Sequence, residues 1–551
     1  MTIDQPGPVA TASGPPQPSP AKPPPSVQTT TRATLAAVAG LAALLLAAIM
    51  ILNGGAFSYA LDDPYIHLAL SKFLLRLHHG LWPGELCSPS SSILYPWLLA
   101  PAALSPGFHL YWPLLLNGLC LAATAAAVVR LLDACRLPGW PLATMVVVTF
   151  HLVGLVFSGM EHSAHILVSL AALLGVIRFL DHDRIPWWLL AAIVVGPLLR
   201  FEGLGISVAA LAALVWRRRF GPAALAAALL TAALGLYGWS MVRLGLPALP
   251  SSVLLKSILA EQAVSSGSSF GLVWALLLNL KLTLSRIPSL SLWLLLLLAA
   301  ARPLTRRPRP GFDHPETVLA GFVVLATAAH LAAGQYGWFN RYEVYVLVVA
   351  ALGTLRLWRD ALAPIAALPW GWTTPAILLL TVGYPYLLTT LTTPLAAANI
   401  FSQQQQMARF VTDYWPEPVA VNDIGLLSYR SPAPVIDLVG LSSEEVRRAR
   451  RDHQYNPAFV ADLLARHRVT LVMLYPDLVK PWGLPEWIEV ARLRLDQPRI
   501  TPGDDAVVFL ATDLTDRPRL IAQLRRFQAT LPWGASLELT SDGQGPPPHT
   551  H

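Results

Sequence analysis

Two adjacent carboxylates, Asp62 and Asp63, follow the first long apolar run of the chain. A carboxylate within hydrogen-bond reach of a hydroxyl can act as its general base, and two adjacent carboxylates repel each other, which raises the pKa of one of them. The same oxygens could instead ligate a divalent cation such as Mg²⁺, Mn²⁺ or Ca²⁺. In a purely structural interpretation, Asp63 caps a helix that starts with Pro64 and stops at Gly80. Because a cap would occupy Asp63, the pattern slightly favours Asp62 as the base.

A second set of polar side chains could hold a negatively charged leaving group. Cationic groups stabilise a departing phosphate, and a guanidinium offers it two parallel N–H donors. The candidates for phosphate binding are Arg341, Lys256, Arg200, Tyr342 and His67. For Arg341 and Lys256, the alternative is contact with lipid headgroups. For Arg200 the alternative is an ion pair with Glu202, and for His67 it is ordinary packing.

Glu161, at the end of a later apolar run, is a third acidic candidate for catalysis. Its neighbours Ser158 and Gly159 would let the chain turn tightly at that point. The alternative is that Glu161 is only a polar residue at the membrane interface.

The composition places these residues in a membrane protein. Of the 551 residues, 54% are hydrophobic and only 13% are charged, with a mean hydropathy of +0.52. Soluble domains carry about 25% charged residues. The net charge of +7 comes from arginine clusters between apolar runs, which are topology signals and exclude a nucleic-acid surface. The three cysteines form no disulfide framework, and no spacing suggests a zinc site.

The apolar runs predict a polytopic α-helical membrane domain of roughly eleven transmembrane helices within residues 33–394. A Pro-rich tail, residues 1–32, precedes it, and we expect this tail to be disordered and cytoplasmic. Arginine clusters end alternate runs, so the positive-inside rule predicts a cytoplasmic N-terminus and an outer C-terminus.

Some segments need separate treatment. Residues 56–109 are predicted to form an outer loop that carries the acidic pair and a short juxtamembrane helix at Ile93–Leu104. One continuous span is expected at Pro141–Phe157. The segment Phe270–Ala300 holds either two spans or one span and an interfacial helix. A proline-broken span between Ile365 and Leu391 is the last crossing.

Residues 395–540 have the mixed composition of a soluble domain, and 541–551 are expected to be a disordered tail. Strands alternate with helices there, which predicts a small α/β domain on the outer, periplasmic face. The expected strands and helices are Val419–Asn422, Leu471–Tyr475, Ala506–Ala511, Ser442–Arg451 and Pro457–His467.

In this topology the polar patches between spans fall on one side of the membrane, which indicates a single outward-facing cavity. The patches are Asp62-Asp63, Ser158–Glu161, Arg200–Gly203, Pro250–Lys256 and Asn340–Tyr342. The order of these features resembles the GT-C membrane glycosyltransferases, which use polyprenyl-phosphate-linked sugars. The motifs DDPYIHLAL, VNDIGLLSY (Val421–Tyr429) and IDLVGL (Ile436–Leu441) look most like the mycobacterial terminal arabinofuranosyltransferase branch. The chain departs from that branch at Phe201, where proline is expected, and at Ser251-Ser252.

The resemblance implies an inverting glycosyltransferase in the bacterial cytoplasmic membrane. It would move a sugar, arabinofuranose in this branch, from a polyprenyl-phosphate donor to a cell-envelope glycan or glycolipid acceptor on the outer face. A GT-C transferase acting on lipid A or on protein is an alternative. A lipid-linked sugar flippase is another, although transporters usually show internal repeats and charges within the membrane. A non-catalytic scaffold that displays the α/β domain is the third.

Overall fold

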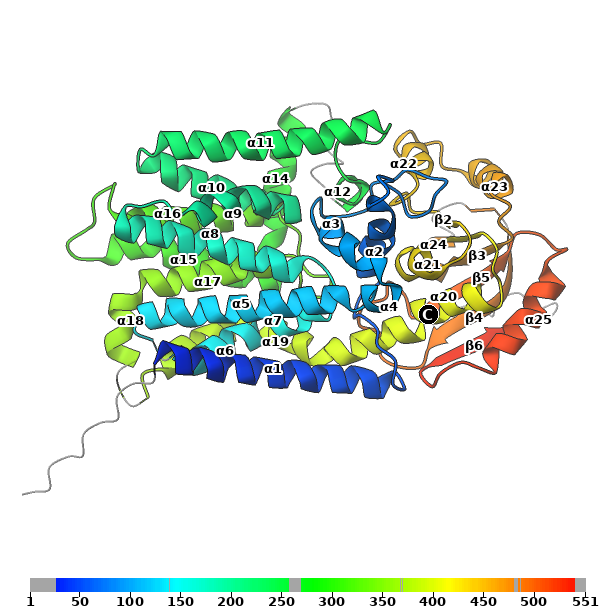
Figure 1. Cartoon of the computed structure of the whole chain (residues 1–551), viewed down its shortest axis with the longest axis horizontal. Helices are drawn as coiled ribbons and strands as arrows, with labels where there is room; N and C mark the ends of the chain where they lie inside the picture. The colour runs from blue at the N-terminus through cyan, green and yellow to red at the C-terminus, as the bar shows by residue number, and fades with distance from the viewer. Residues whose placement is uncertain are drawn as a thin grey trace, which may run out of the picture.

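The computed structural model describes residues 26–137, 139–256, 269–366, 368, 370–479, 484–485 and 487–540. Figure 1 shows a bundle of long helices on the left, an α/β domain on the right, and short helices between them. Most of the tail 1–32 and all of 541–551 lie outside the described residues. Helix α1 (Val27–Leu52) begins inside the stretch predicted to be disordered, because Ser26 accepts a hydrogen bond from the Thr29 N–H and caps it.

Within the described residues, seven helices are long and apolar enough to cross a membrane, and four more are apolar but shorter. A crossing of the ~30 Å hydrocarbon layer needs about 20 apolar residues, or fewer where neighbouring protein surrounds a short helix. The multi-pass helical membrane part predicted from the sequence is therefore confirmed. The long helices are α1, α5 (Trp112–Ala134), α8 (His162–His182), α11 (Phe220–Arg243), α15 (Ile287–Thr305), α16 (Pro315–Ala333) and α19 (Thr373–Ser402). The shorter ones are α6 (Gly139–Thr149), α9 (Trp187–Leu199), α10 (Gly203–Trp216) and α17 (Val344–Leu357).

The structure differs from the predicted spans at several points. The single span expected at Pro141–Phe157 is broken at His151, whose φ of 62° separates α6 from α7 (Leu152–Val156). The segment around 270–300 contains two helices, α14 (Ser269–Thr283) and α15. After α18 (Arg359–Ala366), α19 runs on to Ser402, past the domain boundary predicted at 394, and α20 (Gln404–Asp413) follows at once.

Short helices cover the end of the bundle that faces the α/β domain (Figure 1). They are α2 (Asp63–Leu74), α3 (Tyr95–Leu99), η1 (Ala100–Leu104), α4 (Pro106–His109) and α12 (Ser251–Lys256). The cap position of α2 is Asp62 and its first residue is Asp63, so the prediction of Asp63 as the cap is wrong by one residue. The helix also ends before the predicted stop at Gly80, because Leu77 has a φ of 55°.

The α/β domain contains a six-stranded mixed sheet with the order β2-β1-β3-β5-β4-β6. Its first three strands in that order are parallel, and the remaining pairs are antiparallel. The strands are β1 (Val419–Val421), β2 (Val435–Asp437), β3 (Leu471–Leu474), β4 (Ile488–Leu495), β5 (Ala506–Ala511) and β6 (Ala535–Leu539). Its helices, besides α20, are α21 (Gly425–Arg430), α22 (Glu444–Arg451), α23 (Pro457–Arg466), α24 (Pro476–Val479) and α25 (Arg517–Gln528). The predicted C-terminal α/β domain is thus confirmed.

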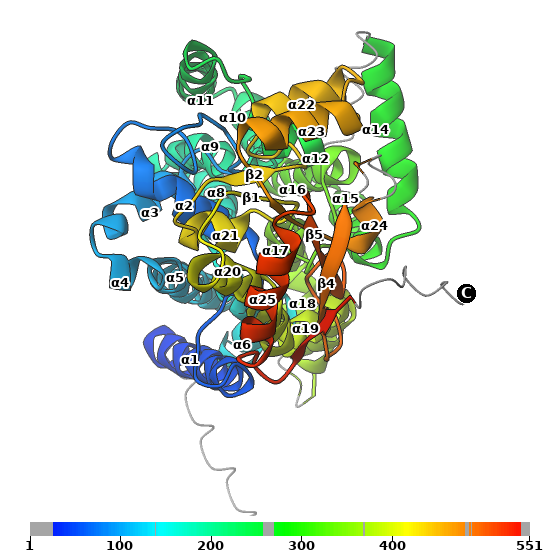
Figure 2. The same cartoon turned by 90° about the vertical axis from the view of Figure 1, so that its right-hand side faces the viewer.

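The α/β domain packs directly on the helix bundle. One continuous apolar core contains buried residues of the bundle, of α2 and of one face of the sheet, such as Tyr65, Leu426 and Phe509. A smaller core under α22 and α23 covers the other face. Figure 2, which looks onto the α/β domain, shows it covering the end of the bundle with α21 beside α2. This arrangement brings the outer loop of the membrane part against the start of the sheet.

Candidate active site

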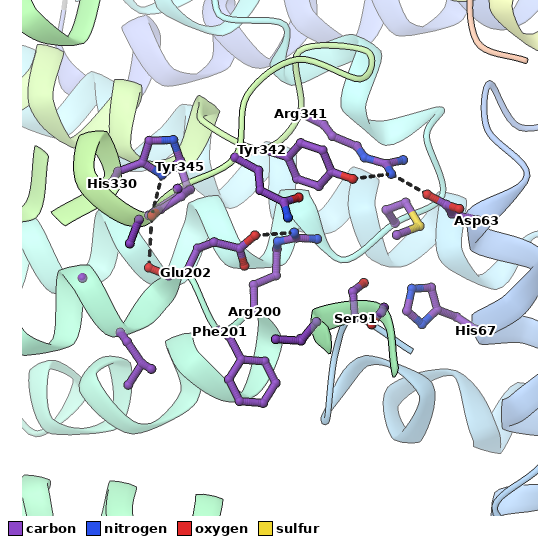
Figure 3. Close-up of a pocket in the computed structure, with 18 of the residues that line it drawn as sticks. Asp63, His67, Ser91, Arg200, Phe201, Glu202, His330, Arg341, Tyr342 and Tyr345 are labelled. Carbon is purple, nitrogen blue, oxygen red and sulfur yellow. Dashed lines mark hydrogen bonds and ion pairs between the residues drawn. The ribbon is translucent and has the colours of Figure 1, made fainter. Parts of the chain in front are cut away.

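A cavity of about 280 Å³ lies at the end of the bundle, beneath the α/β domain. Its polar side chains come from elements far apart in the sequence (Figure 3). They include Asp63 and His67 of α2, Ser91 of the following loop, Arg200 and Glu202 between α9 and α10, Ser252 of α12, His330 of α16, Gln335, Arg341 and Tyr342 between α16 and α17, and Tyr345 of α17. The cavity therefore contains five of the predicted site residues: Asp63, His67, Arg200, Arg341 and Tyr342.

Of the two arginines that line the cavity among the described residues, Arg341 has more donor nitrogens without a hydrogen-bond partner. Its side chain is only 2% exposed, and its Nη2 donates to the Asp63 carboxylate and, at 3.1 Å, to the Tyr342 hydroxyl. Its Nε and Nη1 are buried and have no hydrogen-bond partner among the described residues. A buried donor without a partner costs about 1–3 kcal/mol, and more when it is charged. The guanidinium is thus ready to bind an anion that enters the cavity.

The loop before Arg341 has an unusual backbone. Gly337 and the three following residues, Trp338, Phe339 and Asn340, all have positive φ values between 43° and 80°. Each non-glycine residue held in this region costs of order 1 kcal/mol, and such strain collects at functional sites. The Asn340 amide donates to the Thr389 hydroxyl of α19 at 2.7 Å, which fastens the loop and so fixes the direction of Arg341.

Arg200 is held more fully. Its Nη1 and Nη2 each donate at 2.7 Å, to Glu161 and to Glu202 respectively, and its guanidinium lies 5.2 Å from the ring centre of Tyr342. The predicted ion pair of Arg200 with Glu202 is therefore present, and Arg200 also lines the cavity, while its role in phosphate binding stays a prediction.

Glu161 lies behind the cavity rather than on its described lining. Its side chain is fully buried and accepts hydrogen bonds from Arg200 and, at 2.8 Å, from Ser91. The His67 Nε2 lies 3.3 Å from its second carboxylate oxygen, and the His67 Nδ1 lies 3.0 Å from the Ser90 hydroxyl. A catalytic role for Glu161 stays a prediction.

We expect Glu161→Ala to lower the free energy of unfolding by about 3 kcal/mol, because removing one partner of a buried ion pair leaves the other charge uncompensated. Chemical denaturation of the detergent-solubilised protein measures this change. Glu445→Ala is the matched control, since Glu445 pairs with Arg466 at the surface and should contribute less than about 1 kcal/mol. Loss of activity without loss of stability in Glu161→Ala would instead indicate a chemical role.

Asp63 stands between two cavities. It lines the first cavity and also a second one of about 730 Å³, which opens between the bundle and the α/β domain. Its side chain is 24% exposed, so a ligand in either cavity can reach it. The second, outer cavity is lined by polar and aromatic side chains, which include Asn279, Gln335, Tyr336, Trp338, Asn422, Asp423, Tyr475, Asp477 and Asp504.

Asp62 points elsewhere, although it is adjacent to Asp63. Its two carboxylate oxygens accept hydrogen bonds from the backbone N–H groups of Gly425 at 2.7 Å and Leu426 at 2.8 Å. It is not among the described residues that line either cavity. Burial, together with the nearby carboxyl group of Asp423, raises the pKa of Asp62 to about 8, against the opposing effect of the two N–H donors.

Asp423 is a site residue to which the motif reasoning assigned no role. Its carboxylate accepts hydrogen bonds from the Tyr475 hydroxyl and, at 2.9 Å, from the Gln404 amide, and burial raises its pKa. It follows β1 directly, in the motif VNDIGLLSY, and the end of a strand that leads into a helix is a common place for site residues. That position was the signal in the sequence that could have identified Asp423.

The predicted phosphate-binding residue Lys256 is the last residue of α12, but its side chain lies outside the described part of the structure.

The acidic pair does not fit a divalent-cation site in this arrangement. Both Asp62 oxygens face N–H donors, and Asp63 faces a guanidinium. Within the described ranges, no three His, Cys, Asp or Glu side chains gather in a way that could hold a metal ion.

Comparison with known proteins gives a partial match in sequence and a broader one in structure. A family model described as a domain of unknown function (DUF8728) matches residues 398–510, which span most of the α/β domain. No curated protein matches the sequence. The crystal structure of ArnT from Cupriavidus metallidurans in the apo state is similar with a TM-score of 0.49 and 11% identity, over 89% of this chain and 99% of that one.

Two further solved structures are similar at lower scores. ArnT bound to undecaprenyl phosphate has a TM-score of 0.46 and 12% identity, over 87% of this chain and 98% of that one. A cryo-EM structure of the arabinofuranosyltransferase AftD from Mycobacteria has a TM-score of 0.41 and 15% identity, over 86% of this chain and 41% of that one. In each of these comparisons the structural similarity extends over most of this chain.

Proposed function

We propose that this protein is a membrane glycosyltransferase that moves a sugar from a polyprenyl-phosphate donor to a hydroxyl group of a cell-envelope glycan or glycolipid. The observation that carries the proposal is the buried guanidinium of Arg341, which lines the cavity beside the Asp63 carboxylate and has two donor nitrogens with no partner in the part of the chain that the structure describes. A phosphate anion can accept hydrogen bonds from the guanidinium, and a substrate hydroxyl can donate its proton to the carboxylate.

The donor phosphate and Asp63 would compete for Arg341. A phosphate that binds Nε and Nη1 weakens the ion pair with Asp63 and so makes the Asp63 carboxylate a stronger base. Asp63 then takes the proton of the acceptor hydroxyl as that oxygen bonds to the anomeric carbon. The carbon–oxygen bond to the phosphate breaks, its electron pair leaves with the phosphate, and Arg341 stabilises the departing charge. Attack from the face opposite the phosphate inverts the anomeric centre.

The outer cavity suits the acceptor. Its amide, carboxylate and phenol groups can exchange hydrogen bonds with hydroxyl groups, and Asp63 lies where the two cavities meet. We propose that this face of the membrane part is periplasmic, because the arginine clusters collect at the opposite ends of the helices. Arabinofuranose remains the first sugar to try, on the motif resemblance alone.

The test is a transfer assay with purified protein in detergent or liposomes, a polyprenyl-phosphoryl sugar and a cell-envelope acceptor extract. Formation of a glycosylated product together with free polyprenyl phosphate is the expected result. Translocation of the lipid-linked sugar across liposomes, with no product from any donor tried, would overturn the proposal in favour of a flippase.

A further inference from the structure

Asp62 joins two parts of the chain that are more than 360 residues apart. Each of its carboxylate oxygens accepts one backbone N–H, from Gly425 and from Leu426, the first two residues of α21. These two hydrogen bonds reach one carboxyl group from consecutive N–H groups, so together they fix the orientation of α21 on α2.

Position 425 accommodates this contact only as glycine. A Cβ atom there would come within 2.1 Å of the Asp62 carbonyl oxygen and 2.5 Å of its Oδ2, which no side chain can tolerate. The requirement is steric, because the close approach of two backbones leaves no room. The sequence around α21 is thus built to receive the Asp62 carboxylate.

A second contact joins α2 and α21 near their C-terminal ends. Lys72, near the end of α2, donates to the Tyr429 carbonyl oxygen and lies 3.9 Å from the centre of its ring. The Tyr429 hydroxyl in turn lies 3.4 Å from Nδ1 of His109. Figures 1 and 2 both show α2 and α21 side by side, so the two contacts hold the helices together along their length.

We infer that Asp62 is a positioning residue that links the α/β domain to α2. Through this link it holds Asn422 and Asp423, which form one wall of the outer cavity, close to Asp63. The two sides of this contact adjoin the cavity, because Asp63 follows Asp62 and the Asn422–Asp423 wall ends just before α21. Any shift of α21 on α2 would therefore move this wall relative to Asp63. The contact between Asp62 and α21 does not depend on the proposed function. Only the expected effect of this contact on sugar transfer rests on the proposed function.

The test compares Asp62→Ala, Asp62→Asn and Gly425→Ala by amide hydrogen exchange of residues 419–438 and by the transfer assay. Gly107→Ala is the matched control, because Gly107 also lies in the outer loop and a Cβ there meets nothing within 4 Å. We expect Asp62→Ala and Gly425→Ala each to speed exchange of the α21 amides about tenfold or more. Both should raise the acceptor KM with little change in binding of polyprenyl phosphate, and Gly107→Ala should do neither.

Asp62→Asn separates positioning from catalysis. Its amide oxygen can still accept one N–H, so we expect exchange and transfer between those of the wild type and Asp62→Ala. Complete loss of transfer in Asp62→Asn with unchanged exchange would overturn the inference and make Asp62 the base. Unchanged exchange in both Asp62→Ala and Gly425→Ala would also overturn it. If even the wild type transfers no sugar, the proposed function fails, while the exchange measurement still decides the contact.

Discussion

Asp63→Asn is expected to lower kcat for sugar transfer about 10²–10⁴-fold, the usual contribution of a general base. Asparagine keeps the size of the side chain but cannot take the proton of the acceptor hydroxyl. Polyprenyl phosphate should bind this variant at least as tightly as the wild type, because the Asp63 carboxylate no longer competes for Arg341. The transfer assay and direct binding of polyprenyl phosphate measure the two effects separately.

Asp513→Asn is the control for Asp63→Asn, since Asp513 is an exposed carboxylate of the α/β domain and lines neither cavity. Its transfer rate should equal that of the wild type. Full activity of Asp63→Asn would exclude Asp63 as the base. A loss of polyprenyl-phosphate binding in the same variant would contradict the competition between Asp63 and the phosphate for Arg341.

Most membrane helices could be predicted because charged or small polar residues bound their apolar runs. Helix α9, for example, ends at Leu199, directly before the polar patch Arg200–Gly203. The break at His151 was missed because mostly apolar residues continue on both sides of it, and the hydrogen bond of the His151 ring joins it to Thr390 of α19, 239 residues away. Strand β4 was missed for a different reason, since three charged residues, Glu489, Arg492 and Arg494, interrupt its apolar residues.

For the site, residue types could be predicted but their partners could not. Local motifs named Asp63, Arg200 and Arg341, because carboxylates and guanidiniums at the ends of apolar runs are uncommon without a function. The pairing of Arg341 with Asp63 joins residues 278 positions apart. Helix capping alone also favoured Asp62 over Asp63 for catalysis, and only the contact with α21 reveals what Asp62 binds.

Arg341→Gln is expected to weaken binding of polyprenyl phosphate and to lower transfer, each by about 10²–10³-fold, the usual cost of removing one preorganised donor group. Glutamine removes the charge and the buried Nε and Nη1 donors, which have no hydrogen-bond partner among the described residues. Arg341→Lys keeps the charge but loses the planar pair of donors, so an intermediate loss is expected. Titration with polyprenyl phosphate and the transfer assay measure both variants.

Arg286→Gln is the matched control, because Arg286 lines the outer cavity but not the inner one. Its guanidinium lies 6.0 Å from the ring centre of Tyr336. Polyprenyl phosphate should bind this variant as it binds the wild type, whereas the acceptor KM can change. If Arg341→Gln and Arg286→Gln weakened phosphate binding equally, the phosphate would not be held by Arg341 in the inner cavity. If Arg341→Gln alone weakened it, the two cavities would divide the substrates as proposed, with the phosphate of the donor on one side of Asp63 and the acceptor hydroxyl on the other.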